Sequence, residues 1–305
     1  MNKADMICDL SLIWATVKEV FPYFDRLTAD WDGLYRSCLE RILTIEEEGD
    51  FHRLLTEFME ALHDGHTRYI PPEPYRQEKP FVRPEAPSCA VRDGAVTIRL
   101  NDFLSDYAPF VRQQLEANRD AALVILDIRN NIGGNTFYAA NVAKLFISGV
   151  FHGCRKWTQI RKAVDVAGAS QIAGYSEDRL RQYIRDGLLT EEDIQEAKKE
   201  IGRTKYETYT DSFGAGDHRA LYTGPLQLLI SGKTMSAAED FTAMFKSSRR
   251  GTLMGTPTFG STGTPCMIRL RCGGRAQVVS VGYRLLDGTE FIGTGIQPDV
   301  YRAWE

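Results

Sequence analysis

The sequence contains no apolar segment that approaches the roughly 20 residues of a membrane-spanning helix. It also lacks the short, uninterrupted apolar core of a secretory signal peptide. Asp5 and Asp9 lie where that core would be, and the apolar positions around them follow helical spacing instead. On the sequence given we expect a cytoplasmic protein, or an exported one if a leader has been removed.

Strong charge of either sign is missing as well. The 37 basic and 41 acidic residues leave a formal net charge of −4, too mild to favour nucleic acid or an anionic membrane as a partner. No two of the six cysteines form a CxxC pair, which argues against a zinc ribbon. We interpret the cysteines as reduced thiols.

The chain does have the length and apolar content for a large core, with 305 residues of which 43% are apolar. Residues 1–69 carry three apolar stripes at helical spacing and predict a small N-terminal helical domain. Residues 70–88 are crowded with proline and predict an extended linker. Residues 89–305 alternate strand and helix patterns, which predicts an α/β core.

Within this core, the runs "AALVILDIR" and "LQLLIS" are continuously apolar, as is typical of strands buried in an α/β sheet. The segment at about 155–220 interrupts the alternation with two polar helical patterns, "SEDRLRQYIRDG" and "TEEDIQEAKKEIG". We interpret this segment as an insertion, which is either a lid over a site or a surface excursion.

Ser236, in "TMSAAEDF", lies between the predicted strand "LQLLIS" and a predicted helix. A serine at this junction can present its hydroxyl beside the unpaired N–H groups of the helix start, where the helix dipole favours negative charge. The pattern has a second interpretation, because Ser236 and Glu239 also match the S-x-x-E capping box of many inert helices.

Two further motifs are candidates for chemistry. In "LDIRNNIGGN", Gly133 and Gly134 follow a buried strand, and their N–H groups could approach an oxyanion; an ordinary strand–helix turn is the alternative. In "LHDGHTRY", His66 lies in a tight turn after a helix, where a neutral imidazole could act as a general base. The alternative is a solvated helix end. A metal site at His63 and His66 lacks acidic or cysteine partners, so we expect no metal or other cofactor.

Five motifs in this order resemble peptidase family S41, which includes the C-terminal processing proteases and the tricorn core. They are "DGHTRY", "VILDIRNNIGG", "TMSAAEDF", "GTPTFGSTGT" and "GTGIQPDV", which extend over most of the chain. The resemblance implies a crotonase-like α/β core preceded by a helical bundle. It also implies hydrolysis of peptides or unfolded proteins by a serine peptidase.

The resemblance assigns the nucleophile to Ser236 and the oxyanion hole to the N–H groups of Ala237 and of Gly133 or Gly134. Two features depart from the processing proteases. The PDZ domain that many of them carry after the helical part has no counterpart between residue 67 and the first core strand. Their lysine base would fall at Ser261, and a serine cannot replace that amine.

The tricorn branch instead takes its base from the histidine of the earlier motif, which implies that His66 is the general base. A serine precedes that histidine in the branch, where this chain has Gly65. A glutamate normally lies just before the terminal motif, near Ile292, and Glu290 is two residues away. We therefore expect Glu290 to orient the imidazole.

Two functions of different classes follow from these motifs. The first is a serine peptidase with a Ser236–His66 pair. The second is a catalytically silent protein that binds a ligand or peptide on the same fold, as the retinoid-binding members of the family do. The oligomeric state and the cleavage preference are not addressed by the motifs.

Overall fold

The computed structural model describes residues 1–76, 81–159, 171–172, 174–202 and 206–303. Parts of the predicted linker and of the predicted insertion lie outside these ranges. The described helices and strands run in the order α1 (Lys3–Val20), α2 (Trp31–Thr44), α3 (Glu48–Glu60), β1 (Arg68–Ile70), β2 (Ser88–Arg92), β3 (Ala95–Arg99), α4 (Ala108–Ala117), β4 (Leu123–Asp127), α5 (Thr136–Ala143), β5 (Phe151–Thr158), α7 (Glu177–Arg185), α8 (Glu191–Gly202), β6 (Tyr206–Phe213), β7 (Leu226–Ile230), α9 (Ala237–Ser248), β8 (Thr252–Gly255), β9 (Thr264–Arg269), β10 (Arg275–Arg284) and β11 (Val300–Tyr301).

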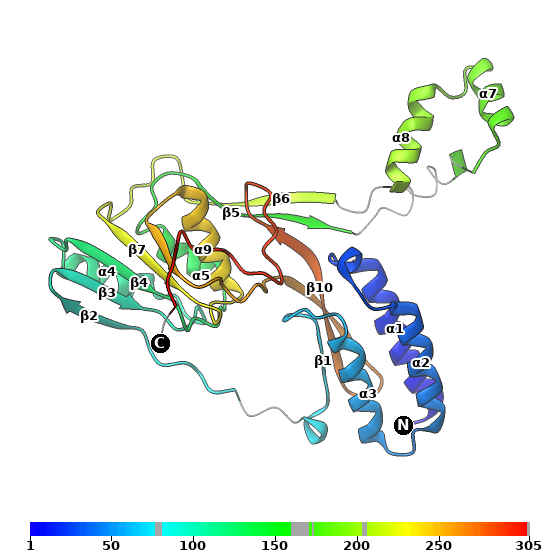
Figure 1. Cartoon of the computed structure of the whole chain (residues 1–305), viewed down its shortest axis with the longest axis horizontal. Coiled ribbons are helices and arrows are strands. Elements are labelled where there is room, and N and C mark those ends of the chain that lie inside the picture. Colours follow the sequence, from blue (N-terminus) through cyan, green and yellow to red (C-terminus); the bar gives the residue numbers. More distant parts are fainter. Residues whose placement is uncertain (77–80, 160–170, 173, 203–205, 304–305) are drawn as a thin grey trace.

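A six-stranded sheet forms one half of the molecule, with the strand order β11-β8-β7-β4-β3-β2 (Figure 1). Its strands are parallel except for the antiparallel β2–β3 pair at one edge. The predicted strands "AALVILDIR" and "LQLLIS" are confirmed as β4 and β7, which pair side by side. Since both strands run the same way, the loops that follow them meet at one edge of the sheet, where open α/β sheets bind ligands.

A second, antiparallel sheet has the order β1-β10-β5-β6, with β9 also paired to β10. The three predicted N-terminal helices are confirmed as α1, α2 and α3. The first packs on β10 and the third on β1, so the turn after α3 is held against this second sheet.

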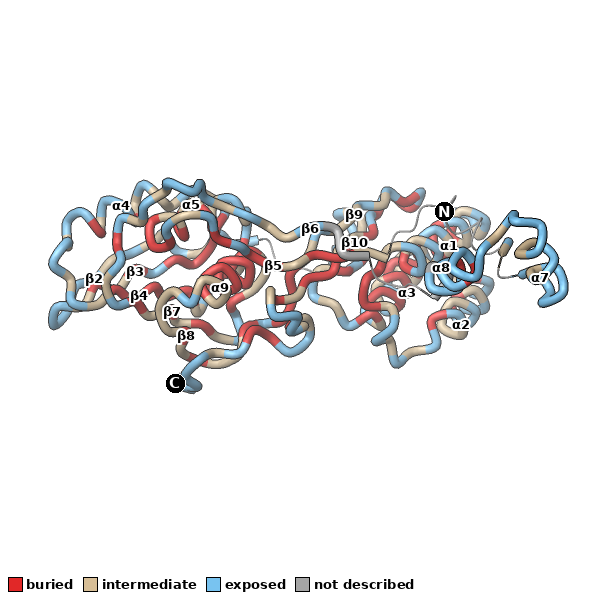
Figure 2. The backbone as a smooth tube through the Cα atoms, turned by 90° about the horizontal axis from the view of Figure 1, so that it is seen from above, coloured by how far each residue is buried: buried red, intermediate tan, exposed pale blue. Residues whose placement is uncertain are grey.

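Buried side chains gather in two regions, which Figure 2 shows around α9 and along the inner faces of the N-terminal helices. The first region joins the parallel sheet to α5 and α9. The second joins α1–α3 to β1 and β10. The first nine residues of α9 are buried, including Glu239 and Asp240, so this helix passes through the core with two carboxylates. The fold is therefore a mixed α/β architecture in which the helix after Ser236 carries two buried carboxylates.

The two polar helices predicted within 155–220 are confirmed as α7 and α8. Figure 1 shows them beyond the far end of the β5–β6 hairpin, projecting away from the parallel sheet. In Figure 1 they lie well away from α9. The strands β5 and β6 were not predicted as such, because their sequences show neither a clear alternation nor a continuous apolar run.

All six cysteines are free thiols, as predicted. Across the described ranges, no helix has both the length and the hydropathy needed to cross a bilayer.

Candidate active site

Ser236 forms the turn between β7 and α9 in a conformation that is rare outside glycine, with φ +57° and ψ −129°. Backbone strain of this kind persists only where the surroundings fix it. Here the Ser236 N–H donates to the Ser261 carbonyl at 3.0 Å, and the preceding Met235 N–H donates to the Asn131 carbonyl at 3.1 Å. The Ser236 side chain makes no capping hydrogen bond, so the capping-box interpretation is wrong.

The Ser236 hydroxyl lies instead against His66, with 3.0 Å between Oγ and the imidazole Nε2. His66 comes from the turn after α3, and its carbonyl accepts a hydrogen bond from Gln277 of β10 at 2.7 Å. The neighbouring Thr67 hydroxyl accepts from the Val279 N–H of the same strand at 3.0 Å. The antiparallel sheet thus positions the His66 imidazole beside Ser236, at the edge of the parallel sheet.

The other imidazole nitrogen, Nδ1, lies 2.6 Å from the Ser261 hydroxyl. If the Ser236 hydroxyl donates to Nε2, then Nδ1 carries the proton and donates to Ser261 Oγ. Ser261 can in turn donate towards Asp64 Oδ1, at 3.5 Å, the outer limit for a hydrogen bond. These contacts form a chain from Ser236 through His66 and Ser261 to Asp64.

Burial lowers the pKa of His66 below its ordinary value of 6.5, opposed by the nearby Asp64 carboxylate. The imidazole is therefore neutral at neutral pH and has a lone pair for the Ser236 proton.

The expectation that Glu290 orients His66 is corrected by this geometry. Glu290 forms an ion pair with Arg26, and the imidazole nitrogens are occupied by Ser236 and Ser261. Ser261, and not Glu290, therefore occupies the Nδ1 side of the imidazole. The sequence had marked Ser261 only as the place of a missing lysine.

The loop that carries Ser261 is held by Glu239 of α9, whose side chain is fully buried. Its carboxylate accepts hydrogen bonds from the Thr258 hydroxyl at 2.5 Å, the Gly260 N–H at 2.7 Å and the Ser261 N–H at 2.8 Å. Burial raises the pKa of Glu239 to about 7, against these three donors. Glu239 is therefore an anchor for the Ser261 loop and not the second half of a capping box.

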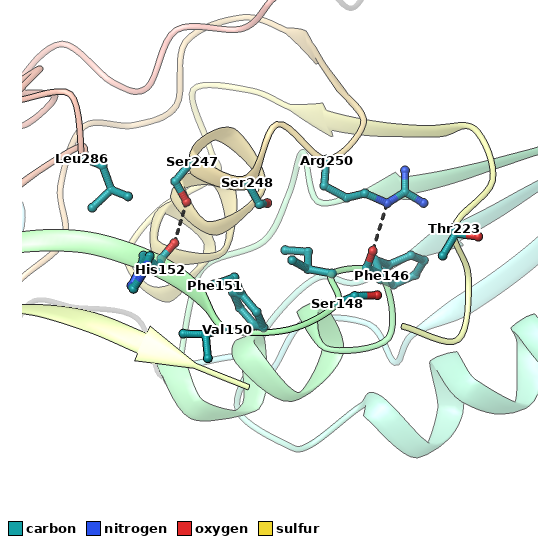
Figure 3. A pocket seen from close by; sticks show the side chains of 11 residues that line it. Phe146, Ser148, Val150, Phe151, His152, Thr223, Ser247, Ser248, Arg250 and Leu286 are labelled. Atoms are coloured by element: carbon teal, nitrogen blue, oxygen red, sulfur yellow. Dashed lines mark hydrogen bonds between the residues drawn. The ribbon is translucent and has the colours of Figure 1, made fainter. Parts of the chain in front are cut away.

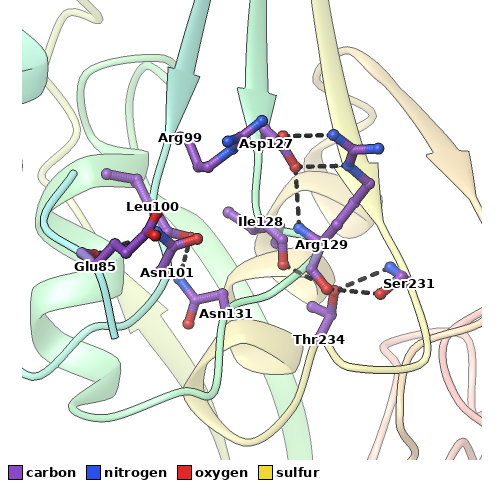
Figure 4. A network of polar contacts seen from close by, with 10 residues as sticks. All are labelled: Glu85, Arg99, Leu100, Asn101, Asp127, Ile128, Arg129, Asn131, Ser231 and Thr234. Carbon is purple, nitrogen blue, oxygen red and sulfur yellow. Dashed lines mark hydrogen bonds and ion pairs between the residues drawn. The ribbon is translucent and has the colours of Figure 1, made fainter. Parts of the chain in front are cut away.

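The glycine loop after β4 lies directly beside the Ser236 turn, and a network of polar contacts holds it there (Figure 4). The Asn131 amide donates to the Leu100 carbonyl at 3.0 Å and accepts from the Gly133 N–H at 2.9 Å. From the other loop, the Thr234 hydroxyl donates to the Ile128 carbonyl at 2.9 Å. The glycine loop is thus anchored to the Leu100 carbonyl and joined to the loop that precedes Ser236.

The structure separates the roles of the two glycines. The Gly133 N–H is taken by Asn131, whereas within the described ranges the N–H groups of Gly134 and Ala237 have no acceptor. Gly133 is needed for close approach, since a Cβ there would lie 2.5 Å from the Cβ of Ser236 and 3.0 Å from the Ala237 nitrogen. Among the described contacts, Gly134 and Ala237 therefore leave unpaired backbone donors beside Ser236.

We predict that Gly133→Ala lowers kcat/KM by roughly 100-fold or more, the scale of losing an oxyanion donor, because the added methyl group must displace Ser236 or the glycine loop. The matched control is Gly288→Ala: Gly288 has a similar φ, +90° against +87° for Gly133, but a Cβ there meets nothing within 4 Å. This control is expected to keep wild-type activity. Equal activity in both variants, measured on a peptide substrate, would show that the close approach at Gly133 is unimportant.

A cavity of about 570 Å³ opens at Ser236 and Gly134 and extends towards the β5–β6 hairpin and β10. Another cavity, of about 500 Å³, lies between β5 and the C-terminal end of α9 (Figure 3). Its polar groups are used by the protein itself: Arg250 donates to the Phe146 carbonyl at 2.9 Å, and Ser247 donates to the His152 carbonyl at 2.6 Å. The first cavity is therefore the one continuous with the reactive groups.

Two family models match the chain. The model described as peptidase family S41 matches residues 95–302, more than half of the chain, and the model described as the tricorn protease C1 domain matches residues 9–60. No curated protein matches the sequence significantly.

Solved structures with the same fold include a putative peptidase from Parabacteroides merdae, with a TM-score of 0.69 and 17% identity over 99% of this chain and 90% of that one. Mature CPAF in complex with lactacystin has a TM-score of 0.67 and 12% identity over 98% and 94% of the two chains. The photosystem II D1 C-terminal processing protease has a TM-score of 0.57 and 14% identity over 97% and 92%. At these identities the likeness establishes a shared fold.

Proposed function

The chain belongs to peptidase family S41, and from this premise we propose that it is a serine peptidase in which Ser236 is the nucleophile and His66 the general base. The observation that carries the proposal is the 3.0 Å contact between Ser236 Oγ and His66 Nε2, made by residues 170 positions apart. The strained backbone at Ser236 and the unpaired N–H groups beside it support the same reading.

In the proposed reaction, His66 Nε2 takes the proton of Ser236 as Oγ bonds to the carbonyl carbon of the scissile peptide. The carbonyl oxygen becomes an oxyanion, and Gly134 and Ala237 donate their N–H groups to it. The intermediate collapses, the C–N bond breaks, and His66 returns the proton to the leaving amine. Water then attacks the acyl-enzyme with His66 again as base, which releases the acid and restores Ser236.

Ser261 is a positioning residue in this proposal, because it contacts the imidazole and not the substrate. It accepts the Nδ1 proton in a hydrogen bond, fixes the tautomer and keeps Nε2 aimed at Ser236. A hydroxyl stabilises a developing imidazolium less than a carboxylate does, and Asp64 behind Ser261 supplies the negative charge at longer range.

We further propose that the α/β part is a crotonase-like core of residues 89–305, preceded by a helical domain of residues 1–69 and joined to it by the segment 70–88. The packing of α1–α3 against the sheet that presents His66 supports a role for the helical part in assembling the site. The expected substrates are peptides and unfolded proteins.

The proposal is tested by incubating the protein with a mixture-based peptide library and sequencing the products by mass spectrometry. Hydrolysis by the wild-type chain and none by Ser236→Ala is the expected result. A folded wild-type chain that cleaves no peptide would favour the silent binding protein instead.

The pH dependence gives a separate prediction. A histidine base must be neutral, and burial lowers the pKa of His66, so kcat/KM should rise with pH in a limb centred below 6.5 and then stay level into mildly alkaline pH. The Asp64 carboxylate raises the pKa of His66 against the effect of burial, so Asp64→Asn should move this limb to still lower pH. A limb above 6.5 that Asp64→Asn leaves in place would point to a different base.

A further inference from the structure

The cavity that opens at Ser236 is distinguished by its charge. Of the described residues that line it, three have acidic or basic side chains: Lys156 on β5, Asp211 on β6 and Asp240 on α9. One ammonium therefore faces two carboxylates. The formal charge of the lining is −1, close to the nucleophile.

The ammonium of Lys156 is already neutralised by the protein. Its Nζ lies 2.9 Å from the Asp211 carboxylate and over the rings of Tyr209 and Tyr283, with centroid distances of 5.0 Å and 4.8 Å. The side chain of Lys156 is only 10% exposed. A substrate carboxylate would have to compete with these contacts for it.

In the part of the chain that the structure describes, no cation forms an ion pair with Asp240. Its two oxygens accept hydrogen bonds from the hydroxyls of Thr136 at 2.6 Å and Thr262 at 3.2 Å, which carry no charge. Burial raises the pKa of Asp240 to about 6, with the Thr136 hydroxyl and the charge of Lys156 opposing this rise, so the group is mainly a carboxylate at neutral pH. Asp240 therefore supplies the negative charge that Lys156 leaves uncompensated.

The lining of the cavity includes exposed aromatic surface, since Phe137 is 72% exposed and Tyr209 is 52% exposed. An aliphatic stem can pack against such rings while a cationic head gains from their π faces. The lining thus combines an excess of negative charge with exposed aromatic rings, and a long basic side chain can interact with both.

Resting on the proposed function, we propose that this cavity binds the side chain of the substrate residue whose carbonyl Ser236 attacks, and that it selects arginine or lysine through Asp211 and Asp240. Gly134 lines the cavity together with Ser236, so the carbon next to a carbonyl held at Gly134 lies at its mouth. A basic substrate side chain would neutralise the formal charge of the lining. An acidic one would make the total charge of lining and substrate side chain −2, which is unfavourable.

The test uses four fluorogenic peptides that differ at this one position: arginine, its neutral isostere citrulline, leucine and glutamate. We expect kcat/KM for arginine to exceed that for citrulline by at least roughly tenfold, the scale of a partly desolvated charge pair, and glutamate to be the poorest. Because the ratio compares two substrates with one enzyme, partial loss of activity in a variant does not obscure it.

Two variants should move the ratio in opposite directions. Asp211→Asn removes a carboxylate and should lower the arginine-to-citrulline ratio, whereas Lys156→Met removes the competing ammonium and should raise it. Asp217→Asn is the matched control: Asp217 is exposed, follows the same strand and does not line the cavity, so the ratio should stay at the wild-type value.

The outcomes separate this inference from the proposed function. Cleavage of citrulline or leucine peptides as fast as arginine peptides would overturn the selectivity and leave the peptidase in place, as would a ratio that neither Asp211→Asn nor Lys156→Met changes. If the folded wild-type chain cleaves none of the four peptides or any library peptide, the proposed function fails and the inference fails with it.

Discussion

Replacing Ser236 by alanine is expected to lower kcat/KM by roughly 10⁴-fold or more, and adding His66→Ala to that variant should lower it no further. The two groups act as a unit, because every proton transfer by the imidazole serves a step of the reaction at Ser236. His66→Ala alone should therefore cost nearly as much as Ser236→Ala. The measurement is hydrolysis of one peptide by the two single variants and the double variant, with folding checked by circular dichroism.

The matched control for His66 is His63→Asn, three positions earlier in the same turn. His63 is exposed and has φ +48°, a conformation that asparagine tolerates, so activity should remain at the wild-type level. If the free-energy losses of the two single variants simply add in the double variant, Ser236 and His66 do not act as a unit. Near-full activity of His66→Ala with loss in Ser236→Ala would leave the nucleophile in place and reject its base.

The second large effect is expected at Glu239, whose carboxylate contacts neither Ser236 nor His66 in the described contacts. In Glu239→Gln, one acceptor of a fully buried carboxylate becomes an NH₂ group facing a backbone N–H donor of the Ser261 loop. An unsatisfied buried donor costs about 1–3 kcal/mol, and the free energy of unfolding should fall by at least that amount. The measurement is urea unfolding of the wild type and the variant.

The Glu239→Gln variant should also lose activity, because the Ser261 loop holds the His66 imidazole. With the loop loosened, Ser261 no longer fixes the imidazole, so we expect kcat to fall while KM changes little. Glu290→Gln is the matched control, because it makes the same exchange in a half-exposed ion pair with Arg26, and pairs of this kind are worth at most about 1 kcal/mol. The reverse result, loss of turnover at Glu290 and none at Glu239, would restore the sequence-based hypothesis about the orienting group.

The local parts of this site could be predicted from the sequence. A buried strand, a short turn and a helix start at Ser236 form a pattern within about a dozen residues, and so do the strand and glycines before Gly134. Each pattern says where a backbone turns and which N–H groups lack partners, since these properties follow from short-range geometry. Such patterns leave Gly133 and Gly134 equivalent, because they do not show that the Asn131 side chain accepts the N–H of Gly133.

The long-range parts could not be predicted in this way. Ser261 meets His66 across 195 positions, and no local pattern relates a serine in a glycine-rich loop to an imidazole in another sheet. Glu239 showed a capping signature, but the tertiary fold buries its carboxylate and turns it to the Ser261 loop instead. Lys156 and Asp211 lie on the β5–β6 hairpin, which the sequence pattern did not reveal, so the charge of the cavity became visible only in the structure.

The claim that Ser236 is a nucleophile activated by His66 is tested most directly by labelling with a fluorophosphonate, followed by peptide mapping. The account predicts one adduct in the wild-type chain, on the peptide that contains Ser236. It predicts none in Ser236→Ala and strongly slowed labelling in His66→Ala. The control Ser280→Ala should label like the wild type, because Ser280 lies on β10 and its hydroxyl donates to the Thr264 carbonyl. An adduct on another serine, labelling of His66→Ala at the wild-type rate, or a wild-type chain that resists the reagent would contradict it.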